Sequence, residues 1–300
     1  MSEYSRYSYV ISEELDLDRP DLEELIRPER LMYFRSNLDA GLRYMGKETL
    51  WIPSNVMRRG INKSIDRTNL PVVSLDDRYA TNADDYIGIS RGVDENLEDS
   101  GYVPRVNYPP ISEQMARIAG LSNEIIIADD VLFSGEMITW LANELKTYGV
   151  KIGGVICGLA IQEGLDRMMS EGIDLEAAIY LDGVEEEICE RDFAIVPGSG
   201  RRIDGLGRNA LYFDPVYGRP EKWASIPSDK AFKFARCQYL NASNLLNIRP
   251  GMQVGDIGDF LGWASTDSAG ALGASKTWLE STDASRSRNY EWDDWDGLVY

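Results

Sequence analysis

The chain has 300 residues, of which 43% are hydrophobic, so it can bury a substantial core. Fifty acidic against 31 basic residues give a formal net charge of −19, and a surface of that sign repels the phosphate backbone of nucleic acids. Histidine is absent, which excludes Ser-His-Asp and Cys-His catalysis and His-ligated zinc. We therefore expect a globular protein without a nucleic-acid partner, whose chemistry relies on carboxylates, Lys, Tyr, backbone donors or an oxygen-bound metal.

The cysteines and the apolar runs indicate a compartment. Cys157, Cys189 and Cys237 are widely spaced and odd in number, which favours a reducing environment over a disulfide frame or a zinc site. No apolar run approaches the roughly 20 residues of a membrane span, and the N-terminal segment lacks the pattern of a secretion signal. We expect a cytoplasmic protein with no membrane partner, in which Cys157 is a core residue.

The first part of the chain predicts one long helix and two short strands. Apolar residues at spacings of three and four predict a helix over residues 31–46, and residues 49–53 and 71–75 read as strands. The intervening stretch is the most basic in the chain. We expect it to be a solvated loop, with a phosphate-facing edge as the alternative. Its cations are Arg58, Arg59, Lys63 and Arg67.

Residues 86–93, "YIGISRGV", predict a short strand that runs into an Arg-Gly turn. The segment that follows is rich in acids, Gly and Pro, and it contains Tyr102, Arg105 and Tyr108. Pro110 then introduces a helix with an apolar face at Ile111, Met115, Ile118 and Leu121.

The stretch "EIIIADDVLFSGEM", residues 124–137, organises the chain. A β-branched run leads into Asp129 and Asp130, which we expect at the end of a strand, followed by a tight loop and a helix that Gly149 ends. The continuously apolar residues 151–161 predict a strand buried on both faces of a parallel sheet. The sequence therefore predicts an α/β fold whose loop after the acids lies at the ligand-binding edge of the sheet.

After residue 161 the sequence predicts further helices and strands, with less regular patterns toward the C-terminus. A helix is expected from residue 162 to Gly172, a strand over 177–183, and a helix over 230–246. A glycine-rich turn follows the apolar run that starts at Phe193. One cluster of acids is most simply a solvated face. These acids are Glu185, Glu186, Glu187, Glu190 and Asp192.

Adjacent carboxylates repel, so Asp129 and Asp130 call for a divalent ion or a sugar diol beside them. The helix start behind them favours an anion such as phosphate. Together these features suggest a ribose phosphate. In the alternative interpretation Asp129 is a turn residue, Asp130 is its solvated neighbour, and Ser134 only caps the helix.

At these residues the sequence resembles a known family. "IIIADDVLFSG" is similar to the phosphoribosyl-pyrophosphate (PRPP) binding motif of type I phosphoribosyltransferases, and "YIGISRGV" to their pyrophosphate loop. The chain departs from the family at Met137, where a Thr or Ser is usual, at Val93, where a second glycine is usual, and at Glu136, a negative charge beside the phosphate site. The resemblance covers roughly residues 70–202.

The resemblance implies a phosphoribosyltransferase-type parallel sheet flanked by helices, with added N- and C-terminal segments. It places residues 1–69 in a helical, hood-like segment, 70–205 in the core and 206–300 in an extension of unknown role. It also implies a role for individual residues. Asp129 and Asp130 would be catalytic and would contact Mg²⁺ indirectly, through ribose hydroxyls or water. The 5-phosphate would be bound by Phe133, Ser134, Gly135, Glu136 and Met137, and the pyrophosphate by Ser90, Arg91 and Gly92. Tyr102 and Arg105 would belong to a mobile loop.

The function that the resemblance implies is Mg-dependent transfer of ribose 5-phosphate from PRPP to a small nitrogenous base, with release of pyrophosphate. Such a protein would belong to nucleotide metabolism, and it could be a homodimer. Base recognition is expected around residues 193–202. Subfamilies that use 6-oxopurines often carry an acid where Phe133 stands, which argues against those bases.

Two other functions stay open. The first is a non-catalytic protein of the same fold that senses PRPP or a nucleotide, which Glu136, Met137 and Val93 favour. The second is a receiver- or phosphatase-like domain with Asp129 as phosphoacceptor. That class needs a lysine at the end of a later strand, and neither residues 151–161 nor 177–183 end in one.

Overall fold

The computed structural model describes residues 9–16, 26–94, 96, 98–105, 108–196, 199–203, 208–213 and 219–247. No helix in these ranges is long and apolar enough to cross a membrane. The chain forms two compact units. The first comprises Met1–Asp18, Leu50–Gly92 and Ser100–Glu187, and the second comprises Arg19–Thr49, Val93–Asp99 and Ile188–Tyr300.

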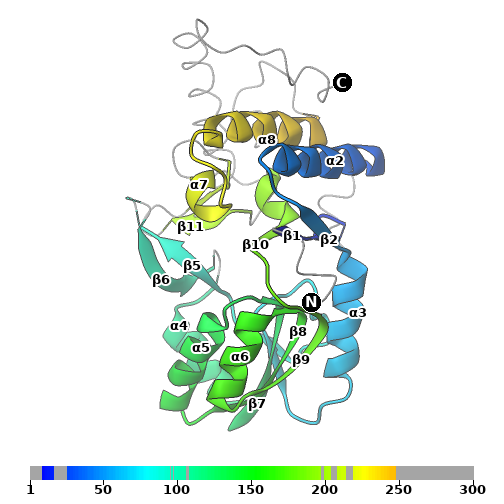
Figure 1. Cartoon of the computed structure of the whole chain (residues 1–300). Helices are drawn as coiled ribbons and strands as arrows, with labels where there is room; N and C mark the ends of the chain where they lie inside the picture. The colour runs from blue at the N-terminus through cyan, green and yellow to red at the C-terminus, as the bar shows by residue number, and fades with distance from the viewer. Residues whose placement is uncertain are drawn as a thin grey trace, which may run out of the picture. The chain divides into compact units, whose positions relative to one another are not determined.

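A five-stranded sheet forms the centre of the first unit (Figure 1). Its strands lie in the order β4-β3-β7-β8-β9, and every neighbouring pair is parallel. The bounds are β3 Val72–Ser74, β4 Asp85–Tyr86, β7 Glu124–Leu132, β8 Lys151–Ile161 and β9 Asp174–Leu181. The predicted α/β class with a parallel sheet is therefore confirmed.

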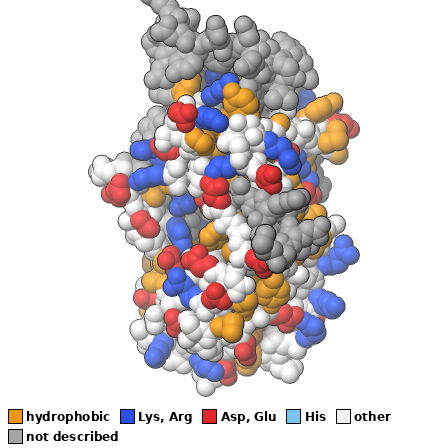
Figure 2. All heavy atoms as spheres, viewed as in Figure 1, with side chains coloured by type: hydrophobic (Ala, Val, Ile, Leu, Met, Phe, Trp, Pro, Cys, Tyr) orange, Lys and Arg blue, Asp and Glu red, His pale blue; other side chains and the backbone are white. Residues whose placement is uncertain are grey.

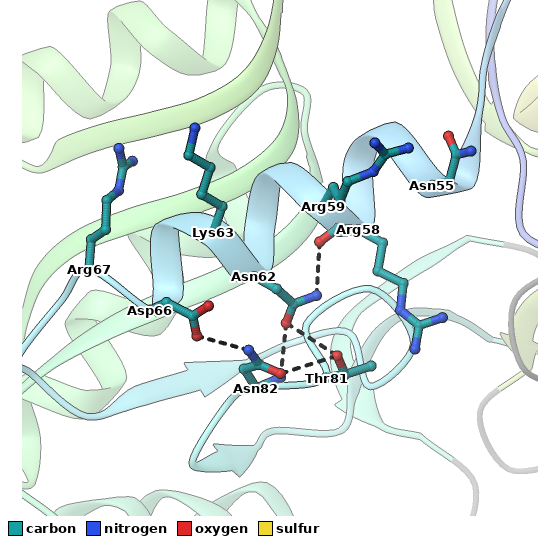
Figure 3. A pocket seen from close by; sticks show the side chains of 9 residues that line it. All are labelled: Asn55, Arg58, Arg59, Asn62, Lys63, Asp66, Arg67, Thr81 and Asn82. Carbon is teal, nitrogen blue, oxygen red and sulfur yellow. Dashed lines mark hydrogen bonds between the residues drawn. The ribbon is translucent and has the colours of Figure 1, made fainter.

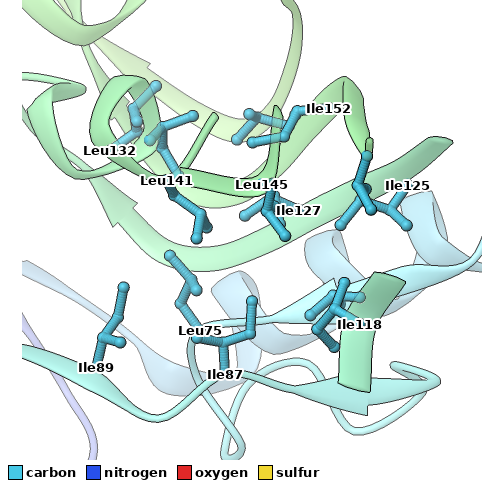
Figure 4. Packing of buried hydrophobic residues seen from close by; sticks show 14 of the residues in the cluster. Leu75, Ile87, Ile89, Ile118, Ile125, Ile127, Leu132, Leu141, Leu145 and Ile152 are labelled. Atoms are coloured by element: carbon cyan, nitrogen blue, oxygen red, sulfur yellow. The ribbon is translucent and has the colours of Figure 1, made fainter. Parts of the chain in front are cut away.

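Helices cover both faces of this sheet (Figure 1). One face packs against α4 (Ile111–Ala119), α5 (Glu136–Thr147) and α6 (Gln162–Glu171), and the other against α3 (Ser54–Ile65). Successive side chains of a strand alternate between faces, and in β7 Ile125 and Ile127 join the first core while Ala128 joins the second. Figure 4 shows the first core, in which both isoleucines lie beside the leucines of α5.

The basic stretch predicted as a loop is the helix α3, so that prediction is wrong. Met57, Ile61 and Ile65 recur every four residues, and all three are buried against the sheet. A Cβ atom on Gly60 would lie 2.2 Å from the Cβ of Ala178, so the glycine lets α3 lie directly on β9. The helical pattern is hard to see in the sequence because its few apolar residues are separated by many cations.

The first unit has further strands. β1 (Tyr9–Ser12) pairs with β2 (Thr49–Ile52), and β5 (Ile89–Val93) pairs with β6 (Asp99–Pro104). The last two form a hairpin within the stretch where the resemblance implies a mobile loop. β9 begins at Asp174, ahead of the predicted residue 177.

In the second unit, α2 (Pro28–Tyr44) packs against α8 (Ala231–Leu245), which confirms both predicted helices. The Asn241 amide joins them by donating to the Phe34 carbonyl at 3.0 Å. The remaining elements begin with β10 (Glu186–Cys189), which spans the boundary between the units. They continue with the 3-10 helix η1 (Glu190–Phe193), β11 (Arg201–Ile203), β12 (Arg208–Ala210) and α7 (Pro220–Trp223).

One acid of the predicted solvated cluster is buried. Glu190 has no exposed surface, and its two carboxylate oxygens accept hydrogen bonds from Arg35 Nε and Nη2, both at 2.7 Å. The solvated interpretation is therefore wrong for this residue. The predicted division at residues 69 and 205 stays a prediction, since each unit is assembled from three separated segments. The role of 206–300 lies largely outside the described residues.

Candidate active site

Asp129 and Asp130 lie inside β7, which continues to Leu132, so the acids do not end the strand as predicted. Both are half-buried. Asp129 Oδ1 accepts a hydrogen bond from the Asp130 backbone N–H at 3.0 Å, and Asp130 Oδ1 accepts one from Val131 N–H at 2.7 Å. Burial raises the pKa of Asp129 well above its ordinary value, and the neighbouring Asp130 raises it further. The raised pKa of Asp129 shows that nearby cations offset the negative charge of this pair only in part.

A third acid, Asp76, belongs to the same cluster and was not identified from the sequence. Ser74 pairs with Ala128, so the loop after β3 begins beside the acids of β7. Asp76 is 4% exposed, and its carboxylate accepts the backbone N–H groups of Arg78 and Tyr79 at 2.8 and 2.7 Å. The available signal was the sequence "SLDD", an acid at the carboxyl end of a predicted parallel strand.

Asp76 is expected to make stability depend on pH. Burial, with the charges of Asp130 and Glu14, raises the pKa of Asp76 to about 7. Between about pH 4 and pH 7 the folded state therefore keeps a proton that the unfolded state has lost, and the free energy of unfolding falls as pH rises. Asp76→Asn, whose amide oxygen can accept the same two hydrogen bonds, should remove the part of this slope that Asp76 contributes.

At pH 8, Asp76→Asn should raise the free energy of unfolding by on the order of 2 kcal/mol. Urea unfolding across the pH range measures this. Asp77→Asn is the matched control, because Asp77 is exposed and adjacent. Equal pH profiles for the two variants would contradict the assignment of the slope to Asp76.

Two residues of the predicted mobile loop lie near these acids. The charge of Arg105 lowers the pKa of both Asp76 and Asp129, and its Nε donates to the Ile89 carbonyl at 2.9 Å. The Tyr108 ring covers Gly88 so closely that a Cβ atom there would lie 2.1 Å from it. The loop thus brings a guanidinium and a phenol toward the carboxylates.

Tyr102, the other residue of that loop, makes a different contact. It lies on β6, and its ring centroid is 4.6 Å from that of Trp140 on α5. The β5-β6 hairpin is therefore packed over the first turns of α5, the helix that begins at the predicted phosphate loop.

The predicted phosphate loop connects β7 to α5. Gly135 has φ +74°, in the left-handed region that favours glycine, and a Cβ there would lie 3.0 Å from Met168 and 3.1 Å from Arg167. The Ser134 hydroxyl accepts a long 3.4 Å hydrogen bond from the Glu136 N–H. The loop is thus held tightly against α6 and leads into the N-terminus of α5.

Glu136 is placed between two arginines. Its Oε2 lies 3.1 Å from Arg91 Nη2, and its Oε1 lies 3.9 Å from Arg167 Nη2. Arg167 also donates from Nε to the Ser134 carbonyl at 2.5 Å. Arg167, which the sequence did not single out, therefore joins the loop to α6, and both cations face a carboxylate of the chain itself.

The residues expected to bind pyrophosphate lie in a strand. Ser90, Arg91 and Gly92 belong to β5, where the sequence predicted a turn. A Cβ atom on Gly92 would lie 2.6 Å from Ser100 Oγ, so this glycine serves the close approach of β5 to β6. The ion pair of Arg91 with Glu136 nonetheless brings the two predicted phosphate-binding groups together. Among the described residues, no cluster of three or more acids or cysteines forms a ready-made metal site.

Comparison with known proteins finds similarity to phosphoribosyltransferases. The chain is 34% identical over 83 residues to a uracil phosphoribosyltransferase of Shouchella clausii, a match that covers 28% of this chain and 38% of that protein. The similarity predicted from the two motifs is confirmed. The chain spans well under half of that relative, and no family model matches it.

Solved structures of low sequence identity are also similar. The adenine phosphoribosyltransferase of Thermoanaerobacter pseudethanolicus is 12% identical, with a TM-score of 0.30 over 42% of this chain and 79% of that chain. The orotate phosphoribosyltransferase of Mycobacterium tuberculosis in complex with PRPP is 14% identical, with a TM-score of 0.28 over 54% and 95% of the two chains.

Proposed function

We propose that the chain is a Mg-dependent phosphoribosyltransferase that moves ribose 5-phosphate from PRPP to a nitrogenous base and releases pyrophosphate. The observation that carries the proposal is the β7–α5 unit: two adjacent carboxylates near the end of β7, Asp129 and Asp130, are followed after a short loop by the left-handed Gly135 and the start of α5. The similarity to a uracil phosphoribosyltransferase supports it.

In this proposal each group acts on a different part of the donor. Asp129 and Asp130 hold the ribose hydroxyls, and their negative charge stabilises the positive charge that develops on the ribose ring. The N–H groups of residues 133–137 and the Ser134 hydroxyl bind the 5-phosphate at the helix start. Arg91, with the backbone around Gly92, binds the pyrophosphate. Arg105 lies near the same acids and would meet the departing group.

The charges of Asp76, Asp129 and Asp130 would be offset by a magnesium ion, although among the described residues these acids do not by themselves form a three-ligand metal site. Mg²⁺ commonly keeps several waters and binds through one or two carboxylates together with substrate phosphates, which agrees with the lack of a closed metal cage among the described residues. When bound, it would neutralise charge on the pyrophosphate as that group leaves.

The decisive experiment is calorimetric titration of PRPP with magnesium into the whole chain and into Asp129→Asn/Asp130→Asn. Micromolar binding that the double variant loses would support the donor site, and absence of binding to the wild type would reject PRPP. A pyrophosphate-release screen over adenine, uracil, orotate and nicotinamide then identifies the acceptor. Release with none of these bases would favour a sensor over an enzyme.

The sensor remains the second candidate because of one observation. Glu136 engages Arg91 and approaches Arg167, two cations that a phosphorylated ligand would use. The acceptor class, a homodimer and a cytoplasmic location all remain part of this proposal.

A further inference from the structure

A polar pocket lies on α3, on the outer side of the helix that covers the other face of the sheet. It has a volume of about 640 Å³ and is lined by polar and charged residues (Figure 3). The lining residues are Asn55, Arg58, Arg59, Asn62, Lys63, Asp66, Arg67, Thr81 and Asn82. Six of these lie on α3 or its C-cap and Arg67 follows directly, at spacings of three and four, so that they form one stripe along the helix.

The stripe has an unusual charge for this protein. Four cations and one acid line the pocket of a chain whose net charge is −19. In the view of Figure 2, Lys and Arg side chains lie along the right-hand edge, where Figure 1 places α3. Like charges held together on one helix face repel each other, so an anion bound among them would relieve that repulsion.

Two of the cations have no partner among the described residues. The side chains of Arg59 and Lys63 are exposed and make neither a hydrogen bond nor an ion pair with any residue in the described ranges. Arg67 differs, because it pairs with Glu176 on β9 and contacts the Ser64 hydroxyl. Arg59 and Lys63 are therefore the groups available to a ligand.

The backbone of the pocket is rigid. The Asn62 amide donates to the carbonyls of Arg58 and Tyr79 at 2.8 and 2.7 Å, and its oxygen accepts from the Asn82 N–H at 2.9 Å. Asp66 accepts from the Asn82 side chain at 2.9 Å. These bonds, of which Figure 3 shows those to Arg58 and Asn82, fix α3 to the loop after β3, so the pocket exists before a ligand arrives.

The lining decides the class of ligand. The volume suits a small molecule, but no aromatic or large aliphatic side chain lines the pocket, so a nucleobase would find no apolar surface there. Guanidinium and ammonium groups bind phosphate oxygens through charge-assisted hydrogen bonds. We propose that the α3 pocket binds a compact polyphosphate group, as in inorganic pyrophosphate, triphosphate or the phosphate chain of a nucleotide, at a site separate from the carboxylate cluster.

The first test is calorimetric titration of inorganic triphosphate into the whole chain and into Arg59→Gln/Lys63→Gln. The double variant should bind at least tenfold more weakly. Arg27→Gln/Lys146→Gln is the matched control, because it removes one Arg and one Lys from other exposed positions and should bind like the wild type. Equal affinities of the pocket variant and the wild type would overturn the proposal.

Two further arms separate this site from the proposed active site and from other ligands. Arg91→Gln should retain triphosphate binding, and binding that depends on Arg91 but not on Arg59 and Lys63 would overturn the proposal. Asn55→Asp, which adds a negative charge to the pocket, should also weaken triphosphate binding.

Inorganic triphosphate and ATP should bind alike if the phosphate chain alone is recognised. Binding of a single-stranded oligonucleotide without binding of triphosphate would instead indicate a nucleic-acid surface.

Discussion

Replacing Glu136 by glutamine is expected to raise the affinity for PRPP about ten- to a hundredfold, if the chain binds PRPP as proposed. In the wild type a carboxylate stands at the start of α5, in the loop that would hold the 5-phosphate, and it engages Arg91 at 3.1 Å. A unit charge about 6 Å from a phosphate dianion costs one to a few kcal/mol at an intermediate dielectric constant. Glutamine removes that repulsion and frees Arg91 and Arg167 to bind phosphate.

The measurement is calorimetric titration of PRPP with magnesium into the wild type, Glu136→Gln and Glu144→Gln. Glu144 lies on the same helix two turns later, so its variant changes net charge equally without touching the loop. An affinity for Glu136→Gln at or below that of the wild type would show that Glu136 positions the two arginines for the donor. A gain shared by both variants would indicate only the effect of net charge.

The β7–α5 unit could be predicted from the sequence because its information is local. A β-branched run, a glycine and apolar residues at spacings of three and four define strand, turn and helix without reference to the rest of the chain. Gly135 adopts the left-handed conformation that such a turn requires. The same holds for β8, whose unbroken apolar run is the mark of a strand buried on both faces.

Asp76 could not be identified in the same way, because its role depends on which strands are neighbours. The segment "SLDDR" resembles any polar turn until β3 is placed beside β7, and that pairing joins residues more than fifty positions apart. Its burial and its raised pKa follow from this neighbourhood. Arg167 was missed for a similar reason, since α6 meets the phosphate loop only in the folded chain.

Charge misled the sequence interpretation twice. The cations of α3 suggested a loop, although the helix is fixed by the few apolar residues on its inner face. Glu190 was assigned to a solvated face because acids surround it in the sequence. Its partner, Arg35, precedes it by 155 residues. Burial of a charge is decided by such distant partners, which composition does not reveal.

Arg35→Met is expected to lower the free energy of unfolding by about 3 to 5 kcal/mol, the usual loss when one partner of a buried ion pair is removed. Glu190 has no exposed surface, and Arg35 supplies two hydrogen bonds and the opposite charge. Arg43→Met on the same helix is the matched control. The Arg43 side chain is 58% exposed, pairs with Asp39 at 2.8 Å and donates to the Thr49 hydroxyl at 3.2 Å, so its loss should cost only about 1 kcal/mol.

Urea unfolding of the whole chain measures both effects, and a double variant identifies their cause. Arg35→Met/Glu190→Leu removes both charges and should recover most of the stability that Arg35→Met loses, because no buried carboxylate is left facing an apolar side chain. If Arg35→Met were no more destabilising than Arg43→Met, the ion pair would be as solvated as a surface pair. If the double variant were as unstable as Arg35→Met, shape and not charge would make Arg35 important. Recovery in the double variant would show that the loss in Arg35→Met comes from the unpaired charge of Glu190, and that apolar side chains can replace the pair between α2 and η1 in the second unit.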